Sequence, residues 1–205
     1  MCLASTGGVV MNKGKSNTAH LFTKEVLFLA LCRLMAVKSI DEITIKELAQ
    51  EAGVSRTTFY RNYKDIEDIL LDYYRNHPFG SLSTEDYEPE KFDLIRCLRY
   101  SLNEIKTHSA VWVNLLNSDN DFIVYRIFDE TIKNTCRDRA FDIGFRSEYE
   151  LSAFVGIYYS ICHEWIKRGM KESVNEMIDI AYSIIHQFYK NDEYAIPERD
   201  DVYQL

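Results

Sequence analysis

The chain has 205 residues, of which 46% are hydrophobic, 13% aromatic and 27% charged. This apolar fraction is enough for a core and excludes global disorder, while 3 Pro and 8 Gly argue against a loop-rich β-sandwich or barrel. No apolar run approaches the roughly 18–20 residues of a membrane span, and no apolar stretch follows a basic start, so neither a membrane protein nor a secreted one is expected.

Charge is distributed unevenly along the chain, whose formal net charge is −8. Residues 1–64 carry 9 basic and 5 acidic side chains, a net charge of +4, and the remainder carries 15 and 27, a net charge of −12. A basic N-terminal part on an acidic body is typical of a small anion-binding module joined to a partner domain. A chance fluctuation in a highly charged chain gives the same pattern, so charge alone decides nothing.

The cysteines lie too far apart for a CxxC motif and are odd in number. We therefore expect a reducing, cytoplasmic location in which the thiols act as small apolar side chains, with one regulatory thiol as the alternative. They are Cys2, Cys32, Cys97, Cys136 and Cys162.

The N-terminal elements are predicted to be helices. Residues 1–15 are expected to form a flexible arm, and apolar residues at helical spacing predict a helix over about 18–38. Thr44 and Glu47 form a capping box that opens a second helix, and Gly53 stands where a helix C-terminus favours positive φ. Two further helices follow, one over 56–62 with Ser55 as its N-cap and one over 65–76 with Asp65 as its N-cap.

The polar, acidic segment 76–90 contains two prolines and predicts a domain boundary, which gives an N-terminal domain at 16–75 and a C-terminal domain at 76–205. Helical patterns of the second domain cover 92–106, 109–117, 121–140, 147–168 and 173–190. The last two are joined by a tight turn and must lie antiparallel. The predicted fold is all-α, a three-helix helix-turn-helix domain followed by a helical bundle.

Residues 44–60 have the features of a helix-turn-helix. Ala49 is small enough for a close helix crossing, Gly53 allows the reversal, and Val54 and Phe59 anchor the following helix. Polar side chains are left near the start of that helix, as a major-groove reader needs. Those side chains are Ser55, Arg56, Thr57, Thr58 and Tyr60.

Groups expected to bind DNA phosphates flank this helix. The N-termini of the second helix, at Thr44, and of the fourth offer backbone N–H groups and a partial positive charge. Tyr60, Tyr63 and Lys64 are expected to contact the backbone on either side. The alternative is that Tyr60 and Tyr63 pack a small core, although Phe59 is the better core ring by its spacing.

Residues 45–70 resemble the DNA-binding domain of TetR-type transcriptional regulators. The similarity runs from Gly53 through Phe59-Tyr60 and Tyr63-Lys64 to Glu67-Asp68-Ile69-Leu70, and it covers about residues 18–75. The stretch 164–173 is similar to a C-terminal subfamily common in Firmicutes. The resemblance implies a homodimer that binds a near-palindromic operator, usually represses transcription, and is released by a small molecule in the body. One member type of this fold is a co-activator that binds another protein, so a module without DNA binding remains the alternative.

Aromatic and polar side chains of the C-terminal domain predict a cavity for an apolar or flat aromatic effector with one or two polar handles. A packed core is the alternative, because aromatics at helical spacing usually serve as core. The predicted lining is Tyr100, Trp112, Tyr125, Phe128, Tyr158, Cys162 and His163.

Surplus apolar surface on the last two helices predicts the dimer interface. A dimer is expected, because one recognition helix contacts few base pairs and two DNA-binding domains are needed for specificity. The predicted interface residues are Leu151, Phe154, Tyr158, Ile161, Met177, Ile184 and Phe188.

An enzyme is not expected, and neither are catalytic residues, metal ligands or a cofactor. The five histidines are scattered, and the sequence has no HExxH, Walker or GxGxxG motif.

Overall fold

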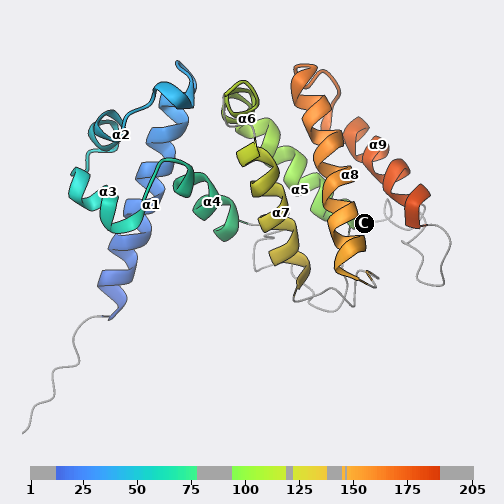
Figure 1. The fold of residues 1–205 in the computed structure, drawn as a ribbon, viewed down its shortest axis with the longest axis horizontal. Coiled ribbons are helices and arrows are strands. Elements are labelled where there is room, and N and C mark those ends of the chain that lie inside the picture. The colour runs from blue at the N-terminus through green and yellow to red at the C-terminus, as the bar shows by residue number, and fades with distance from the viewer. Residues whose placement is uncertain (1–12, 78–93, 119–121, 138–144, 146, 190–205) are drawn as a thin grey trace, which may run out of the picture.

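The computed structural model describes residues 13–77, 94–118, 122–137, 145 and 147–189. Within these residues the chain forms nine α-helices and one short 3-10 helix with no strand, which confirms the predicted all-α class. We call residues 13–77 the head and residues 94–189 the body; the two lie next to each other (Figure 1).

Four α-helices and the 3-10 helix η1 form the head: α1 (Lys13–Met35), η1 (Ile40–Glu42), α2 (Ile45–Glu51), α3 (Arg56–Asn62) and α4 (Glu67–Asn76). The body contains α5 (Leu94–Thr107), α6 (Ser109–Leu116), α7 (Phe122–Arg137), α8 (Glu148–Lys167) and α9 (Val174–Tyr189). In the head, α1 packs against α2 and α4, and α2 packs against α3.

Local signals in the sequence explain where the short head helices begin and end. The capping box is confirmed, since the Glu47 N–H donates to Thr44 Oγ1 at 3.2 Å and the Thr44 N–H donates to Glu47 Oε2 at 3.0 Å. Gly53 has a φ of +68°, the left-handed region in which a side chain is unfavourable. Ser55 Oγ accepts the Thr58 N–H at 3.0 Å and so caps α3.

Two predicted helix starts are corrected. Helix α1 begins at Lys13, within the segment expected to be a flexible arm, because an established helix extends through polar residues at little cost. Helix α4 begins at Glu67 rather than at Asp65. The Asp65 carboxylate still accepts the Asp68 N–H at 2.9 Å, so it binds the first turn from outside the helix. The boundary segment lies outside the described residues from position 78 onward.

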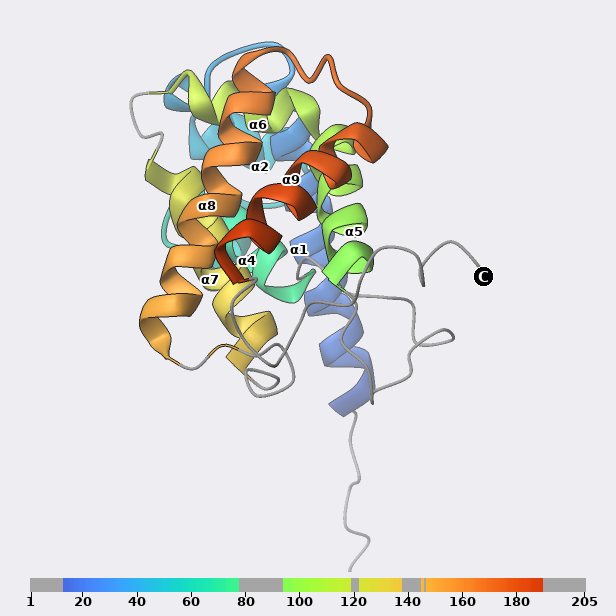
Figure 2. The ribbon, with the colours of Figure 1, turned by 90° about the vertical axis from the view of Figure 1, so that its right-hand side faces the viewer.

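The body is a bundle in which α8 packs against α6, α7 and α9, and α9 also packs against α5. Gly169, with a φ of +80°, ends α8, and the Met170 N–H bonds to the Trp165 carbonyl at 2.8 Å. The Ser173 N–H donates to the Glu176 carboxylate at 2.7 Å and caps the return helix. Figure 2 looks onto the side of the body away from the head, where α8 and α9 cross the surface.

The head and the body meet where α1 contacts α6 and α4 contacts α7, a contact that we call the joint. Asn114 on α6 is the polar centre of the joint. Its Nδ2 donates to the carbonyls of Met35 and Lys38 at 2.8 and 2.6 Å, and its Oδ1 accepts the Ile40 N–H at 2.9 Å. One side chain of the body therefore satisfies three backbone groups at the end of α1.

Candidate nucleic-acid interface

Helix α3 is held by one buried ring and presents polar side chains on its other faces. Phe59 is fully buried, whereas Tyr60 is 60% exposed and Arg56 and Thr57 are exposed. The Arg56 and Thr57 side chains make no hydrogen bond or ion pair with the described part of the chain. Because α3 lies at the outer edge of the head, on the side away from the body (Figure 1), these side chains are available to an external partner.

Two of the predicted base-contacting residues have a local role in the fold. The Ser55 hydroxyl caps α3 and lies 2.9 Å from Thr58 Oγ1. Thr58 is half-buried, and its hydroxyl interacts with that of Ser55. Five residues were expected to face outward. In three of them, Arg56, Thr57 and Tyr60, the polar group of the side chain makes no hydrogen bond or ion pair within the described residues.

Tyr63 was expected to contact DNA, but the structure places it in the core of the head. Its ring is only 6% exposed, and its hydroxyl donates to Asp72 Oδ2 at 2.8 Å. Lys24 Nζ binds the other oxygen of Asp72 at 2.9 Å. Burial, and then the bond to Asp72, raise the pKa of Tyr63 above its usual value, so the phenol remains a neutral donor. The side chain therefore joins α3 to α4 and α1 and is not free for a phosphate.

The predicted phosphate site at the N-terminus of α2 is covered by a carboxylate. The Thr44 hydroxyl lies 2.9 Å from Glu47 Oε2, and Lys38 Nζ donates to Glu47 Oε1 at 2.7 Å. Hydrogen bonds from Lys38 and then Thr44 lower the pKa of Glu47 to about 2. An ionised carboxylate at this position opposes a phosphate group, which argues against Thr44 as a contact.

Carboxylates also cover the N-terminus of α4. Asp65 accepts the Asp68 N–H, and Asp68 Oδ2 accepts the Lys64 N–H at 2.9 Å. The exposed ammonium of Lys64, next to the C-terminus of α3, is then the group of this segment that suits a phosphate. Sequence analysis missed Arg61, which is also exposed and lies one helical turn after Thr57; that i, i+4 spacing was the available signal.

Some of the residues predicted to line an effector cavity do contact one another, but they do so as a packed aromatic core. Trp112 and Phe128 are fully buried with ring centroids 5.8 Å apart, and Phe128 lies 5.8 Å from Tyr158. Tyr158 bonds to the hydroxyl of Ser101 and contacts Cys162, which is also fully buried.

The other predicted lining residues are less buried. Tyr125 and His163 each contact the ring of Tyr159 at 5.4 Å, so they adjoin the core on α7 and α8. Tyr100 lies apart on α5, and it makes no ring contact with the described aromatic side chains. Burial, and then Glu104, raise the pKa of Tyr100 above its usual value.

Most of the predicted dimer residues face the interior of the single chain. Leu151, Phe154, Tyr158 and Met177 are each at most 8% exposed, because the stripe of a helix that looks most apolar is the one its own bundle buries. Ile161 and Ile184 are half-buried, and the side chain of Phe188 lies outside the described residues. The surfaces of α8 and α9 that remain exposed carry other residues.

Among the described residues, no group of three His, Cys, Asp or Glu side chains is placed to hold a metal ion. No described helix is both long and apolar enough to cross a bilayer.

Comparison with known proteins connects this geometry to one family. Residues 23–73 match the family model described as bacterial regulatory proteins, tetR family. An uncharacterized HTH-type transcriptional regulator from Haemophilus influenzae is 37% identical over 43 residues, which are 21% of this chain and 21% of that protein. The chain thus matches about a fifth of this relative's length.

Solved structures of similar fold cover most of the chain. The dihydroxyacetone kinase operon activator DhaS superposes with a TM-score of 0.61 at 19% identity, over 83% of this chain and 97% of its own. A TetR transcriptional regulator from Streptococcus agalactiae superposes with a TM-score of 0.53 at 15% identity, over 85% of this chain and 99% of its own. These likenesses extend the similarity in fold from the head to the body.

Proposed function

We propose that this chain is a regulator of the TetR family, whose model residues 23–73 match, and that it acts as a homodimer that binds a near-palindromic operator through α3. One observation carries the proposal. Arg56, Thr57 and Tyr60 project from a short helix that Phe59 anchors, and Lys64 follows at the end of that helix. A polar helix surface flanked by a cation is the arrangement that a major-groove reader uses.

Different roles are proposed for these side chains. Arg56 and Thr57, in the first turn of α3, are proposed to contact base edges, because the start of a recognition helix enters the groove. Tyr60, Arg61 and Lys64 are proposed to bind phosphates and to fix the position of α3 on the duplex.

The dimer is proposed to form through the exposed surfaces of α8 and α9 that Figure 2 faces. On α8, Ala153 and Ser160 are exposed and Gly156 is partly exposed, and such small side chains let a second helix approach closely. On α9, Ile180 is 42% exposed and supplies apolar area. Two heads on one such body would meet half-sites about 34 Å apart, or a multiple of that distance.

Release by a small molecule in the body is proposed to act through α4. Tyr74 on α4 is fully buried against Trp112 of α6 at 5.0 Å, and Trp112 continues to Phe128 and Tyr158. A ligand that favours another packing of these rings would move α4 and change the spacing of the two heads.

We further propose that DNA binding represses transcription. One solved neighbour is named an operon activator, but a likeness at 19% identity shows the fold alone. A co-activator that binds another protein remains the second candidate, and it predicts no operator.

The DNA beside the coding region, searched for an inverted repeat, supplies the probe for footprinting and gel shifts. We expect Tyr60→Ala and Lys64→Ala to weaken binding to all sequences, and Thr57→Ala to change the sequence preference. Binding that is unaltered by all three substitutions would remove α3 from the interface. Operator affinity at fixed salt that stays constant with every ligand that stabilises the protein would reject the effector switch.

A further inference from the structure

A thiol, an imidazole and a carboxylate meet where α1 packs against the start of α6. His108 is the N-cap of α6, and its Nε2 lies 3.2 Å from Glu104 Oε1 on α5. The imidazole also reaches α1, where its centroid lies 5.5 Å from that of the Phe28 ring. Cys32, one helical turn after Phe28, forms a hydrogen bond with His108. The head thus supplies the thiol, and the body supplies an imidazole that a carboxylate orients.

This arrangement has the features of a reactive cysteine. A thiolate is the nucleophilic form of the side chain, and an imidazolium beside it favours that form. The hydrogen bonds of His108 to Cys32 and then to Glu104 raise its pKa to about 9, so the ring is charged at neutral pH. Cys32 is partly exposed and is not part of a disulfide, so a small reagent can reach the sulfur.

The other titratable groups next to this cluster come from α4. The Tyr73 hydroxyl donates to Glu104 Oε1 at 3.3 Å, and its ring centroid lies 6.0 Å from that of His108. Burial, and then Glu104, raise the pKa of Tyr73 above its usual value, so the phenol remains a neutral donor. His77 stacks on the other ring system at 4.3 Å from Tyr73. Glu104 is therefore held between His108 and Tyr73 as the acceptor of both.

We propose that Cys32 is a modification site, a thiol that hydroperoxides oxidise to a sulfenic acid. The thiolate sulfur attacks the peroxide oxygen that carries the hydrogen, so an S–O bond forms and the O–O bond breaks. The sulfur gives up two electrons, and the leaving oxygen departs with them. That oxygen takes the proton of the His108 imidazolium and leaves as an alcohol, or as water when the oxidant is hydrogen peroxide.

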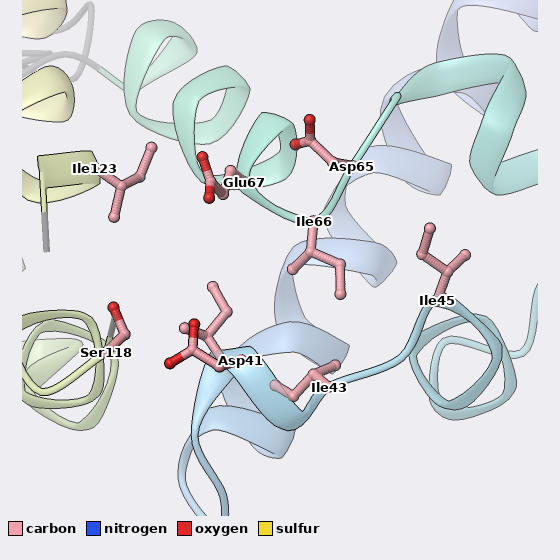
Figure 3. Close-up of a pocket in the computed structure, with 9 residues that line it drawn as sticks. Asp41, Ile43, Ile45, Asp65, Ile66, Glu67, Ser118 and Ile123 are labelled. Carbon is pink, nitrogen blue, oxygen red and sulfur yellow. The ribbon is translucent and has the colours of Figure 1, made fainter. Parts of the chain in front are cut away.

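Oxidation changes the contact between the head and the body. The thiolate and the imidazolium both lose their charge, and an oxygen atom is added where α1 packs against α6. The joint has room to respond, because a cleft of about 340 Å³ lies beside it, between η1 and the start of α4 on one side and Ser118 and Ile123 on the other (Figure 3). An effect of this change on operator binding rests on the proposed function, whereas the oxidation of Cys32 does not.

Sulfenic acid can be measured at each cysteine by trapping with dimedone and peptide mapping by mass spectrometry. The reduced full chain is treated with hydrogen peroxide at neutral pH without DNA. Cys97 on α5 is also partly exposed and serves as the reference thiol. We expect Cys32 to be oxidised at least about tenfold faster than Cys97. Equal rates, or faster oxidation of Cys97, would overturn the proposal.

A substitution tests the role of the imidazole. His108→Gln removes the proton donor and is expected to slow the oxidation of Cys32 at least about fivefold. His20→Gln, at an exposed position on α1, is the matched control and is expected to leave the rate unchanged. A variant that only loosened the joint would expose the sulfur and speed the reaction. An unchanged or faster rate in His108→Gln would therefore contradict the proposal.

Thermal unfolding before and after peroxide treatment tests the consequence for the joint. Oxidation is expected to lower the Tm of the wild-type protein and to leave that of Cys32→Ser unchanged, because the variant has no sulfur at this contact. Equal shifts in the two proteins would assign the damage to other residues and reject Cys32 as the site that matters.

Discussion

The predicted functional residues of the head and of the body differ in their exposure to solvent. In the head, Tyr60 is 60% exposed on a short helix whose caps and turn lie within about ten residues of it. In the body, Tyr158 is 2% exposed and packs against Phe128 and Ser101, which come from other helices. A binding surface formed by one helix can be predicted from a local sequence pattern. Whether a buried aromatic side chain lines a cavity or packs the core depends on contacts between distant segments.

The largest expected effect separates two adjacent rings of α3. Phe59→Ala is expected to lower the free energy of unfolding by about 3–5 kcal/mol, because it empties a fully buried site. Tyr60→Ala is expected to change that free energy by at most about 0.5 kcal/mol, because its ring is largely in water. Urea unfolding followed by circular dichroism measures both. Similar losses for the two variants would mean that Tyr60 also belongs to the core.

A second substitution tests how the two regions are connected. Asn114→Ala removes two donors and one acceptor from backbone groups at the joint, and it is expected to cost about 1–3 kcal/mol of unfolding free energy. Asn103→Ala, at an exposed position on α5, is the matched control and is expected to be nearly neutral. Loss of equal size in the control would assign the effect to asparagine replacement rather than to the joint.

Sequence reasoning succeeded where structure is local. The capping box at Thr44, the positive φ of Gly53 and the Ser55 cap each follow from a few neighbouring residues and are confirmed. For Tyr63 the structure favours the alternative of core packing, which the sequence left open because the partner of its hydroxyl, Asp72, belongs to the next helix.

The joint and the dimer surface show the same limit on a larger scale. No local pattern of Asn114 indicates that it binds backbone groups more than 70 residues earlier in the chain. The stripe of α8 that includes Leu151 was predicted to be a dimer surface. Hydrophobic spacing indicates that a stripe is buried, but it does not indicate whether the same chain or a second copy covers it.

A smaller effect distinguishes two hydroxyls of the recognition helix. Ser55→Ala is expected to lower stability by about 1 kcal/mol, because it removes the N-cap of α3. Thr57→Ala is expected to leave stability unchanged, because its side chain is exposed. Denaturant midpoints at equal slope measure the difference. Should Ser55→Ala prove neutral, the hydroxyl would be free for DNA instead.

The last expected effect is a pH dependence at the joint. A hydrogen bond to Cys32, and then one to Glu104, raise the pKa of His108 from 6.5 to about 9. The stabilisation from the imidazolium is thus complete below pH 6.5 and is lost as the pH rises through 9. His108→Gln is expected to flatten the fall in stability between these values, while the exposed His20→Gln retains it. An unchanged slope in His108→Gln would assign the pH dependence to other groups.

The most direct test of the account is selection of bound sequences from randomised duplex DNA at fixed salt, with the wild-type protein and with Thr57→Ala. The account predicts an inverted repeat for the wild type, and for the variant the same repeat with relaxed preference at one position of each half-site, worth about 1–3 kcal/mol. Failure of the wild-type protein to enrich any sequence would contradict it.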